Sequence, residues 1–263
     1  MCDTCNHPVT SETATHEQYV ASSIIRFGRL KNYIEEKLIV DKFAVQGNLK
    51  VAEGLRKYVQ ENLEELQKTP KIQILDVGPA IGAISSMLAL QVLDEFDLLE
   101  KAQVHLQDVS MNVIEQTQRC NFFYPESLLR PDLKAKIFQK LRQSKFEISS
   151  AEKIPWKNNH FNIVLACFLF HHLHDSIKPL AAKEMSRVLK PNGFLGIAEE
   201  WFENYHEYSQ AHQNDPIPLA FESIIDYKHL SKMVPDLKIF FSEYSGKNNS
   251  YAFCGSKVKP HQR

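Results

Sequence analysis

The sequence predicts an α/β fold in which a mostly parallel, seven-stranded sheet carries helices on both faces. Short apolar runs typical of buried strands alternate along the chain with segments whose apolar residues recur at three- and four-residue steps. This alternation stops near the C-terminus, where two β-like runs follow each other across a turn-forming segment, so we expect an antiparallel hairpin there. A helical stretch also precedes the first strand, which predicts a helical N-terminal extension.

The N-terminal part divides into a tail and a helical layer. Residues 1–18 are polar, rich in Thr, Ser and His, and without an apolar period, which predicts a flexible tail. Within residues 19–69 the helical period is carried by Ile24, Ile25, Phe27, Leu30, Tyr33, Ile34, Leu38, Leu55, Tyr58, Val59, Leu63 and Leu66. Pro70 ends this layer, and we expect residues 70–258 to form one domain.

Strands and helices alternate through that domain. We predict strands at 72–77, 103–107, 146–149, 161–167 and 194–198, with helices at 84–99, 113–118, 133–141 and 178–188. The last two strands, 237–244 and 251–255, flank Ser245-Gly246-Lys247-Asn248-Asn249, whose composition favours a hairpin turn. The result is a Rossmann-like sheet, which binds ligands at the carboxyl ends of its parallel strands.

The composition is that of a folded globular protein. The chain has 263 residues, of which 43% are hydrophobic and 24% charged, and its formal net charge of −1 provides no global field for a polyanion. No run approaches the roughly 20 apolar residues of a membrane span, and the polar N-terminus lacks the apolar core of a signal peptide. We therefore expect a cytoplasmic protein without membrane association. The five scattered cysteines fit free thiols in a reducing compartment.

A loop of small residues follows the first predicted strand. It reads Asp76-Val77-Gly78-Pro79-Ala80-Ile81-Gly82, and small residues at this place let the backbone approach a ligand closely. Alone, the loop is a weak signal, and a tight strand-to-helix connection is the less favoured alternative. Asp108, at the end of the second predicted strand, favours the ligand, because a carboxylate can accept both hydroxyl protons of a ribose. The spacing from Asp76 to Asp108 exceeds the roughly 20 residues of dinucleotide-binding folds, which argues against a nicotinamide cofactor.

Five blocks in a fixed order give the chain a family resemblance. They are Ile74-Leu75-Asp76-Val77-Gly78; Asp108-Val109-Ser110; Ala151-Glu152-Lys153-Ile154-Pro155-Trp156 followed by Phe161-Asn162-Ile163-Val164; His171-His172-Leu173-His174-Asp175; and Glu184-Met185-Ser186-Arg187-Val188-Leu189-Lys190-Pro191-Asn192-Gly193-Phe194-Leu195. With these blocks, about residues 72–200 resemble the class I S-adenosylmethionine-dependent methyltransferases. The resemblance is to the group that acts on small molecules and includes the ubiquinone and menaquinone methylases.

The resemblance implies a site for S-adenosylmethionine at the carboxyl edge of the sheet. Asp76 would receive hydrogen bonds from the ammonium side of the cofactor through the loop or a water, and Asp108 would hold the ribose. Ala151 would offer its backbone N–H to the adenine. Cys167 and Phe168 would lie beneath the sulfonium at the end of the fourth strand. The predicted cofactor-binding set is completed by Gly78, Ala80, Gly82, Val109 and Glu152.

Two positions depart from the family pattern. Ala80 adds a methyl group where the family usually has glycine, and Pro79 stiffens the turn, so the pocket is expected to be narrower. Ser150 stands where many relatives carry an acid that accepts the adenine amino group. A hydroxyl can accept that hydrogen bond too, but without charge assistance.

Histidines just after the fourth predicted strand are the candidate catalysts. Methyl transfer mainly requires alignment and exclusion of water, so a base is optional. If the acceptor is a phenol, catechol or enol, His171 or His172 could accept its proton. Histidines in a short loop-to-helix segment also serve as caps, so a structural role stays open.

Three carboxylates lie near the same strand ends. We expect Asp175 to cap the helix that follows it. Glu199 and Glu200 come after the fifth predicted strand, where solvated loop carboxylates are the commoner case and a place along the substrate side is the alternative.

Two further features allow more than one interpretation. The spacing Cys2-x-x-Cys5-x-His7 suits zinc, but no second pair of ligands stands at finger-like distance, so we predict no metal. The segment 201–230 is rich in aromatic residues and histidine. Together with Tyr19, Phe27 and Tyr33 it could form an apolar, substrate-covering lid, while an ordinary packed helix pair is the alternative.

The leading hypothesis is a methyltransferase that uses S-adenosylmethionine and acts on a small molecule at oxygen, nitrogen or carbon. Methylation of nucleic acid or protein is a second hypothesis; against nucleic acid, the chain has no Asn/Asp-Pro-Pro-aromatic motif and no basic surplus. A non-catalytic binding protein with the same fold is a third, motivated by Ala80 and Ser150. The acceptor, the methylated atom and the oligomeric state do not follow from the sequence.

Overall fold

The computed structural model describes residues 42–79, 83–120, 128–202, 204, 206, 207, 210, 227–245 and 250–258. The predicted tail and the first part of the predicted N-terminal layer lie outside this range, as does most of the predicted lid. The part of the layer that is described is helical and forms α2 (Lys42–Glu61) and α3 (Leu63–Lys68).

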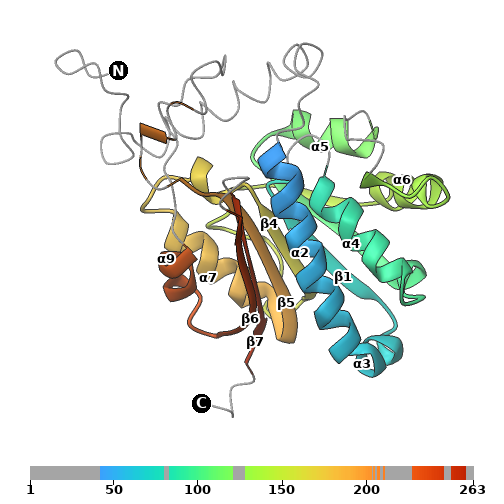
Figure 1. The fold of residues 1–263 in the computed structure, drawn as a ribbon. Coiled ribbons are helices and arrows are strands. Elements are labelled where there is room, and N and C mark those ends of the chain that lie inside the picture. Colours follow the sequence, from blue (N-terminus) through green and yellow to red (C-terminus); the bar gives the residue numbers. More distant parts are fainter. Residues whose placement is uncertain are drawn as a thin grey trace.

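The described chain then alternates between strands and helices (Figure 1). The strands are β1 (Ile72–Val77), β2 (Ala102–Asp108), β3 (Lys145–Ile148), β4 (Phe161–Cys167), β5 (Leu189–Glu200), β6 (Leu237–Ser245) and β7 (Ser250–Lys257). The helices are α4 (Ile84–Asp94), α5 (Met111–Gln118), α6 (Lys134–Arg142), α7 (Lys178–Val188) and α9 (Tyr227–Met233), with short 3-10 turns η1 (Leu99–Lys101) and η3 (Phe170–His172).

The seven strands form one sheet in the order β3-β2-β1-β4-β5-β7-β6. The first five are parallel, whereas β7 pairs antiparallel with both β5 and β6. The predicted Rossmann-like sheet with an antiparallel C-terminal hairpin is therefore confirmed. The strand order reverses between β1 and β4, and such a switch point is where open α/β sheets bind ligands.

The core has two layers because successive strand residues point to opposite faces of the sheet. In β1, Ile72 and Ile74 belong to an apolar cluster that includes buried residues of α2, α4, α5 and α6. Leu75 and Val77 belong to a second cluster, with α7 and α9. Figure 1 shows α2 and α4 on one side of the sheet and α7 and α9 on the other. Helices thus cover both faces, as the sequence predicts.

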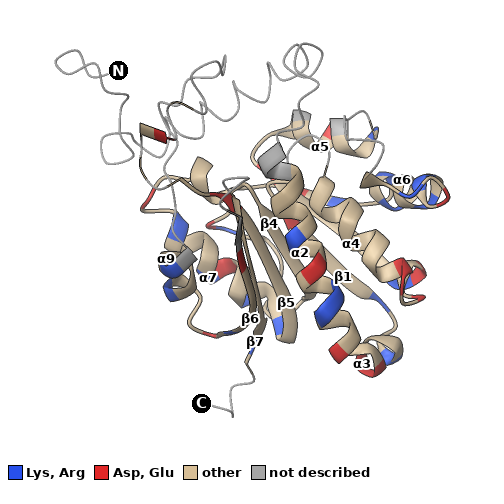
Figure 2. Cartoon of the chain, in the orientation of Figure 1, with Lys and Arg blue, Asp and Glu red and all other residues tan. Residues whose placement is uncertain are grey.

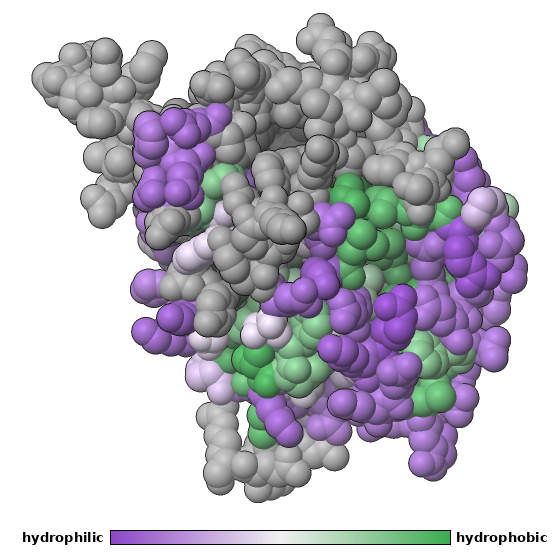
Figure 3. Space-filling model, viewed as in Figure 1, coloured by the Kyte–Doolittle hydropathy of each residue, from purple (hydrophilic) through white to green (hydrophobic). Residues whose placement is uncertain are grey.

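Charge on the described surface is mixed. Figure 2 shows Lys and Arg interspersed with Asp and Glu on the outer sides of the helices, while the strands are mostly uncharged. In Figure 3 hydrophilic side chains dominate this view, and hydrophobic ones gather near the N-terminal ends of α2 and α4. Among the described helices, none combines the length and hydropathy that crossing a membrane requires.

The helix predicted over 84–99 ends earlier, at Asp94. Asp97 adopts a left-handed conformation with φ of 58°, and the N–H of Leu98 reaches back to the carbonyl of Leu93 at 2.8 Å. This is the hydrogen-bond pattern of a helix C-cap. The buried Leu98 and Leu99 continue the apolar pattern after the helix has ended, which is why the pattern alone overestimates its length.

The fifth strand is longer than the predicted 194–198. It begins before Phe194, and Glu199 and Glu200 are its last two residues, paired with Tyr251 and Ser250 of β7. Glu199 is fully buried and Glu200 is 9% exposed. The expectation of solvated loop carboxylates at these positions is therefore wrong, because pairing with the antiparallel hairpin extends the strand through both acids.

Candidate functional site

Asp76 is a buried acid at the strand-order switch point. It lies opposite Leu106 of β2 and Leu165 of β4. Its Oδ2 accepts hydrogen bonds from the hydroxyls of Ser85 and Ser86 in the first turn of α4, each at 2.6 Å. Its Oδ1 is also buried and meets no hydrogen-bond donor among the described residues. Burial raises the pKa of Asp76 to about 6, although the two hydroxyls act to lower it.

Asp108 is a second buried acid, at the end of the neighbouring strand β2. Its side chain accepts the N–H of Ser110 at 2.8 Å. Burial raises the pKa of Asp108 to about 7; the backbone N–H groups of Ser110 and Val109 lower it, and the nearby Asp76 raises it. Two adjacent strands thus end in carboxylates that are costly to ionise without a cationic or hydrogen-bond-donating partner.

Gly78 makes the turn that leaves β1. Its φ of 66° lies in the left-handed region, and its N–H donates to the carbonyl of Gln107 at 2.8 Å. A Cβ at this position would lie 2.7 Å from Cδ1 of Leu169. The turn therefore requires glycine both for its backbone conformation and for the contact with Leu169. Ala80 and Gly82, which belong to the predicted loop, lie outside the described residues.

Phe168 follows β4 in a strained backbone conformation. Its φ is 58°, unusual for an aromatic residue, and its N–H donates to the carbonyl of Ala198 in β5 at 2.7 Å. Such strain costs about 1–3 kcal/mol and is found preferentially at functional sites. The preceding Cys167 is a buried free thiol, and burial raises its pKa well above the ordinary value, with smaller contributions from Asp76, Cys254 and Glu199. Cys167, one of the two residues predicted beneath the sulfonium, is thus near enough to Asp76 for the acid to affect its pKa, and Phe168 is the next residue along the chain.

Helix α2 packs directly on Phe168. A Cβ on Gly47 would lie 2.7 Å from Cζ of Phe168 and 3.0 Å from Cβ of Ala198. Only a residue without a side chain lets the helix approach the ring this closely. The described part of the N-terminal layer therefore borders the candidate site.

His171 lies in η3, just after Phe168, and forms a buried pair with Glu199. Its Nδ1 lies 2.6 Å from Oε2 of Glu199, and Oε1 of Glu199 accepts the N–H of Phe170 at 2.6 Å. The ring of His172 is close to that of His171, with centroids 3.8 Å apart. The two predicted candidate bases are thus adjacent, and Glu199 contacts the ring of His171.

Asp175 does not provide the expected cap. Helix α7 starts at Lys178 with Ile177 in the N-cap position and without a capping side-chain hydrogen bond. Asp175 instead accepts a hydrogen bond from the ammonium of Lys178 at 2.6 Å. His174 also accepts a backbone N–H here, since its Nδ1 lies 3.2 Å from the nitrogen of Ser176.

The loop after β3 carries Ala151 and Glu152 and lies next to Asp108. The N–H of Ser149 donates to the carbonyl of Asp108 at 3.1 Å, and the side chain of Gln107 donates to the carbonyl of Ser150 at 3.0 Å. Ala151 is buried. The hydroxyl of Ser150 donates to Glu152. A carboxylate therefore lies next to position 150, where an acid is expected from the family pattern. Residues 148–150 and 152–157, at the end of β3 and in this loop, also line an open cavity of about 740 Å³ together with Glu184 and Arg187 of α7.

Arg187 and Glu184 of α7 hold this loop in place. Arg187 donates to both carboxylate oxygens of Glu184 and to the carbonyls of Ile154 and Trp156. Glu184 in turn accepts the N–H of Ile154 at 2.9 Å. The N–H and the carbonyl of Ile154 are therefore both held by α7. The sequence blocks contain Arg187 and Glu184, but their role was not predicted because their loop partners are about thirty positions away and follow no periodic pattern.

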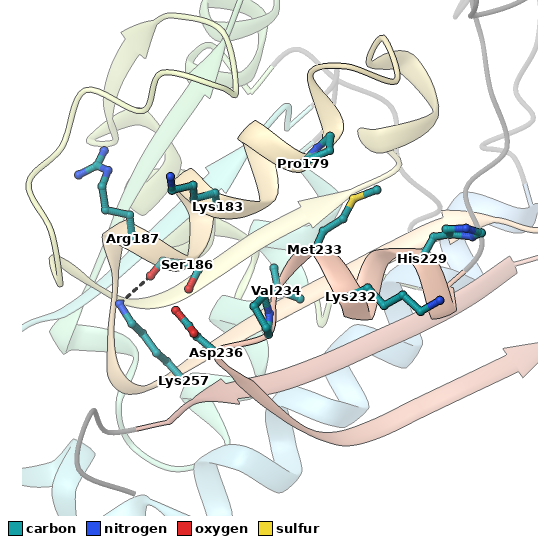
Figure 4. Close-up of a pocket in the computed structure, with 11 residues that line it drawn as sticks. Pro179, Lys183, Ser186, Arg187, His229, Lys232, Met233, Val234, Asp236 and Lys257 are labelled. Atoms are coloured by element: carbon teal, nitrogen blue, oxygen red, sulfur yellow. Dashed lines mark hydrogen bonds between the residues drawn. The ribbon is translucent and has the colours of Figure 1, made fainter. Parts of the chain in front are cut away.

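A second cavity, of about 670 Å³, lies between α7 and α9, outside the predicted site (Figure 4). Figure 4 shows Lys183 on α7 on one side, and His229 and Lys232 on α9 on the other. At its base, Lys257 of β7 donates to the carbonyl of Ser186 at 2.7 Å. None of the predicted site residues lines this cavity.

Lys257 ties the last strand to the end of α7. Its ammonium donates to the carbonyls of Ser186 and Leu189 and to the side chain of Asn159, at 2.7, 2.8 and 3.0 Å. Lys257→Met keeps the aliphatic stem but removes all three bonds, so we expect the free energy of unfolding to fall by about 1–3 kcal/mol. Urea unfolding measures this loss. Lys183→Met, on the exposed side of α7, is the control, and an equal loss in both variants would contradict the prediction.

Within the described residues no group of three His, Cys, Asp or Glu side chains is arranged to hold a metal ion. Cys2, Cys5 and His7 lie outside them. Cys120, Cys167 and Cys254 are free thiols. The candidate site therefore consists of buried acids, a strained aromatic residue and a histidine–glutamate pair at the carboxyl edge of the parallel strands.

Comparison with known proteins gives a consistent picture. A family model described as a methyltransferase domain matches residues 75–197. The chain is 25% identical over 178 residues to the ubiquinone/menaquinone biosynthesis C-methyltransferase UbiE of Rickettsia akari. This match covers 65% of the present chain and 63% of the relative, so the chain spans less than two thirds of the relative's length.

Solved structures share the fold at low identity. Magnesium protoporphyrin IX methyltransferase from Synechocystis, solved with bound S-adenosylhomocysteine, matches with a TM-score of 0.61 and 10% identity, over 91% of this chain and all of that one. The [4+2]-cyclase SpnF matches with a TM-score of 0.50 and 15% identity, over 79% and 81% of the two chains. Because the two proteins are named for different reactions, the fold alone does not decide the chemistry.

Proposed function

The chain belongs to the class I S-adenosylmethionine-dependent methyltransferases through residues 75–197, and from this premise we propose that the protein methylates a small organic molecule. When bound, S-adenosylmethionine supplies a methyl group that its sulfonium has already activated. The protein's own task is then to bind the two reactants, align them and exclude water.

The observation that carries the proposal is the pair of buried carboxylates at the ends of β1 and β2. Asp76 is fully buried, and its Oδ1 meets no donor among the described residues. A buried acceptor without a partner costs about 1–3 kcal/mol. The ammonium of the cofactor's methionine part would offset this cost at Asp76, and a ribose would donate its two hydroxyls to Asp108. The residues present therefore fit the cofactor.

The other predicted residues have places consistent with the same ligand. The loop of Ala151 and Glu152 lies next to Asp108, where the adenine of a ribose-bound nucleoside would extend. Cys167 and Phe168 lie on the Asp76 side, where the sulfonium would be. The complete set that we propose for the cofactor is Asp76, Gly78, Ala80, Gly82, Asp108, Val109, Ala151, Glu152, Cys167 and Phe168.

A small molecule is the acceptor that the observations favour. The net charge of −1 gives the chain no basic surplus, and in Figure 2 the described helices carry charges of both signs. The name of the Rickettsia relative adds carbon methylation of a quinone precursor as a specific candidate. We propose His171 and His172 as the histidines at the acceptor side, because they follow β4 directly after Phe168.

Calorimetry with S-adenosylhomocysteine and transfer of labelled methyl groups test the proposal. We expect saturable binding of one ligand per chain, and label in small phenolic or quinol acceptors rather than in RNA or protein. If label appears only in RNA or only in protein, that macromolecule is the acceptor and the proposal of a small-molecule acceptor is wrong. Absence of binding at millimolar concentrations of S-adenosylhomocysteine would reject the proposed function altogether.

A further inference from the structure

Glu199 and His171 form a hydrogen-bonded pair that is almost closed to solvent. Glu199 is 0% exposed and His171 is 7% exposed, and Nδ1 and Oε2 are 2.6 Å apart. Both oxygens of Glu199 are used, because Oε1 accepts the N–H of Phe170. The carboxylate is therefore fixed in orientation by the backbone of η3, and it fixes the imidazole in turn.

This arrangement decides which imidazole nitrogen carries the proton. A carboxylate can only accept a hydrogen bond, so the neutral ring of His171 must have its hydrogen on Nδ1. Nε2 then has a free lone pair, and it has no hydrogen-bond partner among the described residues. This is the tautomer that a general base requires, because the nitrogen that accepts the proton carries none.

The pair lies beside the residues proposed for the cofactor. The rings of His171 and Phe168 meet edge to face with centroids 6.4 Å apart. The charges of Asp76 of β1 and Glu199 both help to raise the pKa of the Cys167 thiol in β4. The titratable groups near this pair thus include His172 of η3, which contacts the His171 ring, and Glu200, which follows Glu199 in β5.

We propose that Glu199 is a positioning residue that keeps Nε2 of His171 available as the base, and that the acceptor is a phenol or enol whose hydroxyl proton His171 removes. This inference rests on the proposed function and deepens it. In the step, the O–H bond breaks and its proton moves to Nε2. The resulting oxyanion, or the ring or enol carbon conjugated with it, forms the new bond to the methyl carbon, while the sulfur keeps the electron pair of the broken C–S bond.

The geometry favours His171 over its neighbour His172 as the base. The His171 ring is held by a fully buried carboxylate, and this carboxylate is itself held by a backbone N–H. A base that is fixed in this way contributes about 100- to 10,000-fold to a proton transfer.

The first test reads the tautomer without any acceptor. Long-range ¹H–¹⁵N spectra of histidine-labelled protein should show the proton of His171 on Nδ1, with the signal assigned by its loss in His171→Asn. In Glu199→Gln the amide NH₂ can face Nδ1 only as a donor, so the proton should move to Nε2. Wild-type protein with the proton on Nε2 would overturn the proposal.

The second test measures transfer to 1,4-dihydroxynaphthalene, kept reduced, with benzylamine as the comparison acceptor. We expect transfer to the diol, and a fall in kcat of about 100- to 10,000-fold in both Glu199→Gln and His171→Asn, with KM changed less than about threefold. The rate of the wild type should rise with pH, because only a neutral imidazole can accept the proton of the acceptor, and this rise should disappear in Glu199→Gln. A carboxylate with a merely structural role would change stability but leave the pH profile in place.

Glu200→Gln and the binding of S-adenosylhomocysteine separate the possible failures. Glu200→Gln removes the adjacent carboxylate without touching His171, so the rise of rate with pH should persist. If wild-type protein does not bind S-adenosylhomocysteine, the proposed function fails. If it binds and methylates benzylamine only, or neither acceptor, the phenol or enol class is wrong. If Glu199→Gln binds S-adenosylhomocysteine normally and keeps the wild-type kcat, only the positioning role of Glu199 on His171 is rejected.

Discussion

Asp108→Asn should weaken the binding of S-adenosylhomocysteine by about 10- to 100-fold, because the amide can accept from only one of two ribose hydroxyls and carries no charge. The substitution is conservative for the fold. The remaining oxygen can still accept the N–H of Ser110, which the native Oδ1 accepts at 2.8 Å. Calorimetry at about pH 8 measures the change in affinity.

The same variant should be more stable than the wild type when no ligand is bound. Burial raises the pKa of Asp108 to about 7 from an ordinary value of 3.8, so the folded state holds the proton more tightly than the unfolded state. The stability that this proton provides is complete below about pH 4 and is lost as the pH rises through about 7. Asn stays neutral, and at about pH 8 we expect a gain on the order of 2–4 kcal/mol.

The pH dependence of binding follows from the same carboxylate. In the wild type, affinity should rise as the pH increases through about 7, because the ribose hydroxyls bind the ionised form of Asp108. In Asp108→Asn only the weaker dependence from Asp76, whose pKa is about 6, should remain. Asp132→Asn, at an exposed acid paired with Arg130, is the control and should leave the affinity unchanged. An unchanged affinity in Asp108→Asn would remove this residue from the site.

The strands and helices could be predicted where apolar runs have clear ends. β1, β4 and α7 have the predicted bounds because Gly78 and Phe168 adopt a positive φ directly after the two strands and Pro179 lies in the first turn of the helix. The parallel sheet follows from the alternation of strands and helices, and the terminal hairpin from the point where this alternation stops. Asp76 and Asp108 could also be anticipated, since a residue at the end of a parallel strand lies at the ligand-binding edge whatever its neighbours are.

Contacts between distant segments could not be predicted from local pattern. Glu199 was expected in a loop because the strand pattern weakens after Ala198, yet pairing with Tyr251 extends the strand and buries the acid against His171. Which histidine would meet a carboxylate depends on the path of η3, and this path has no period in the sequence. The same holds for Arg187, whose partners lie in an irregular loop.

Arg187→Met should destabilise the protein by about 2–4 kcal/mol, the largest loss of stability that we expect from a single exchange outside the apolar core. Arg187 donates five hydrogen bonds, two to Glu184 and three to the loop, at the carbonyls of Ile154 and Trp156 and the side chain of Asn158. Methionine can replace the stem but none of the donors, so the two carbonyls lose their protein partner. Urea unfolding gives the loss.

Affinity for S-adenosylhomocysteine should fall about tenfold in the same variant, although Arg187 is not one of the proposed ligand-binding residues. The loop it holds carries Ala151, and a loop that is no longer fixed must be ordered again when the ligand binds. An ordering cost of about 1.4 kcal/mol corresponds to that factor. Adenosine, which contains the adenine and ribose but not the amino acid, should lose affinity by the same factor.

Arg56→Met is the matched control for Arg187→Met. Arg56 also binds a carboxylate through two nitrogens, with distances of 2.6 and 2.8 Å to Glu95, but this pair lies exposed between α2 and the end of α4. An exposed pair contributes at most about 1 kcal/mol, and no loop depends on this one. If both arginine variants lost the same stability and neither lost affinity, the ion pair rather than the backbone carbonyls would be what Arg187 contributes. A difference confined to Arg187→Met would show that the helix α7 positions the adenine loop from outside the site.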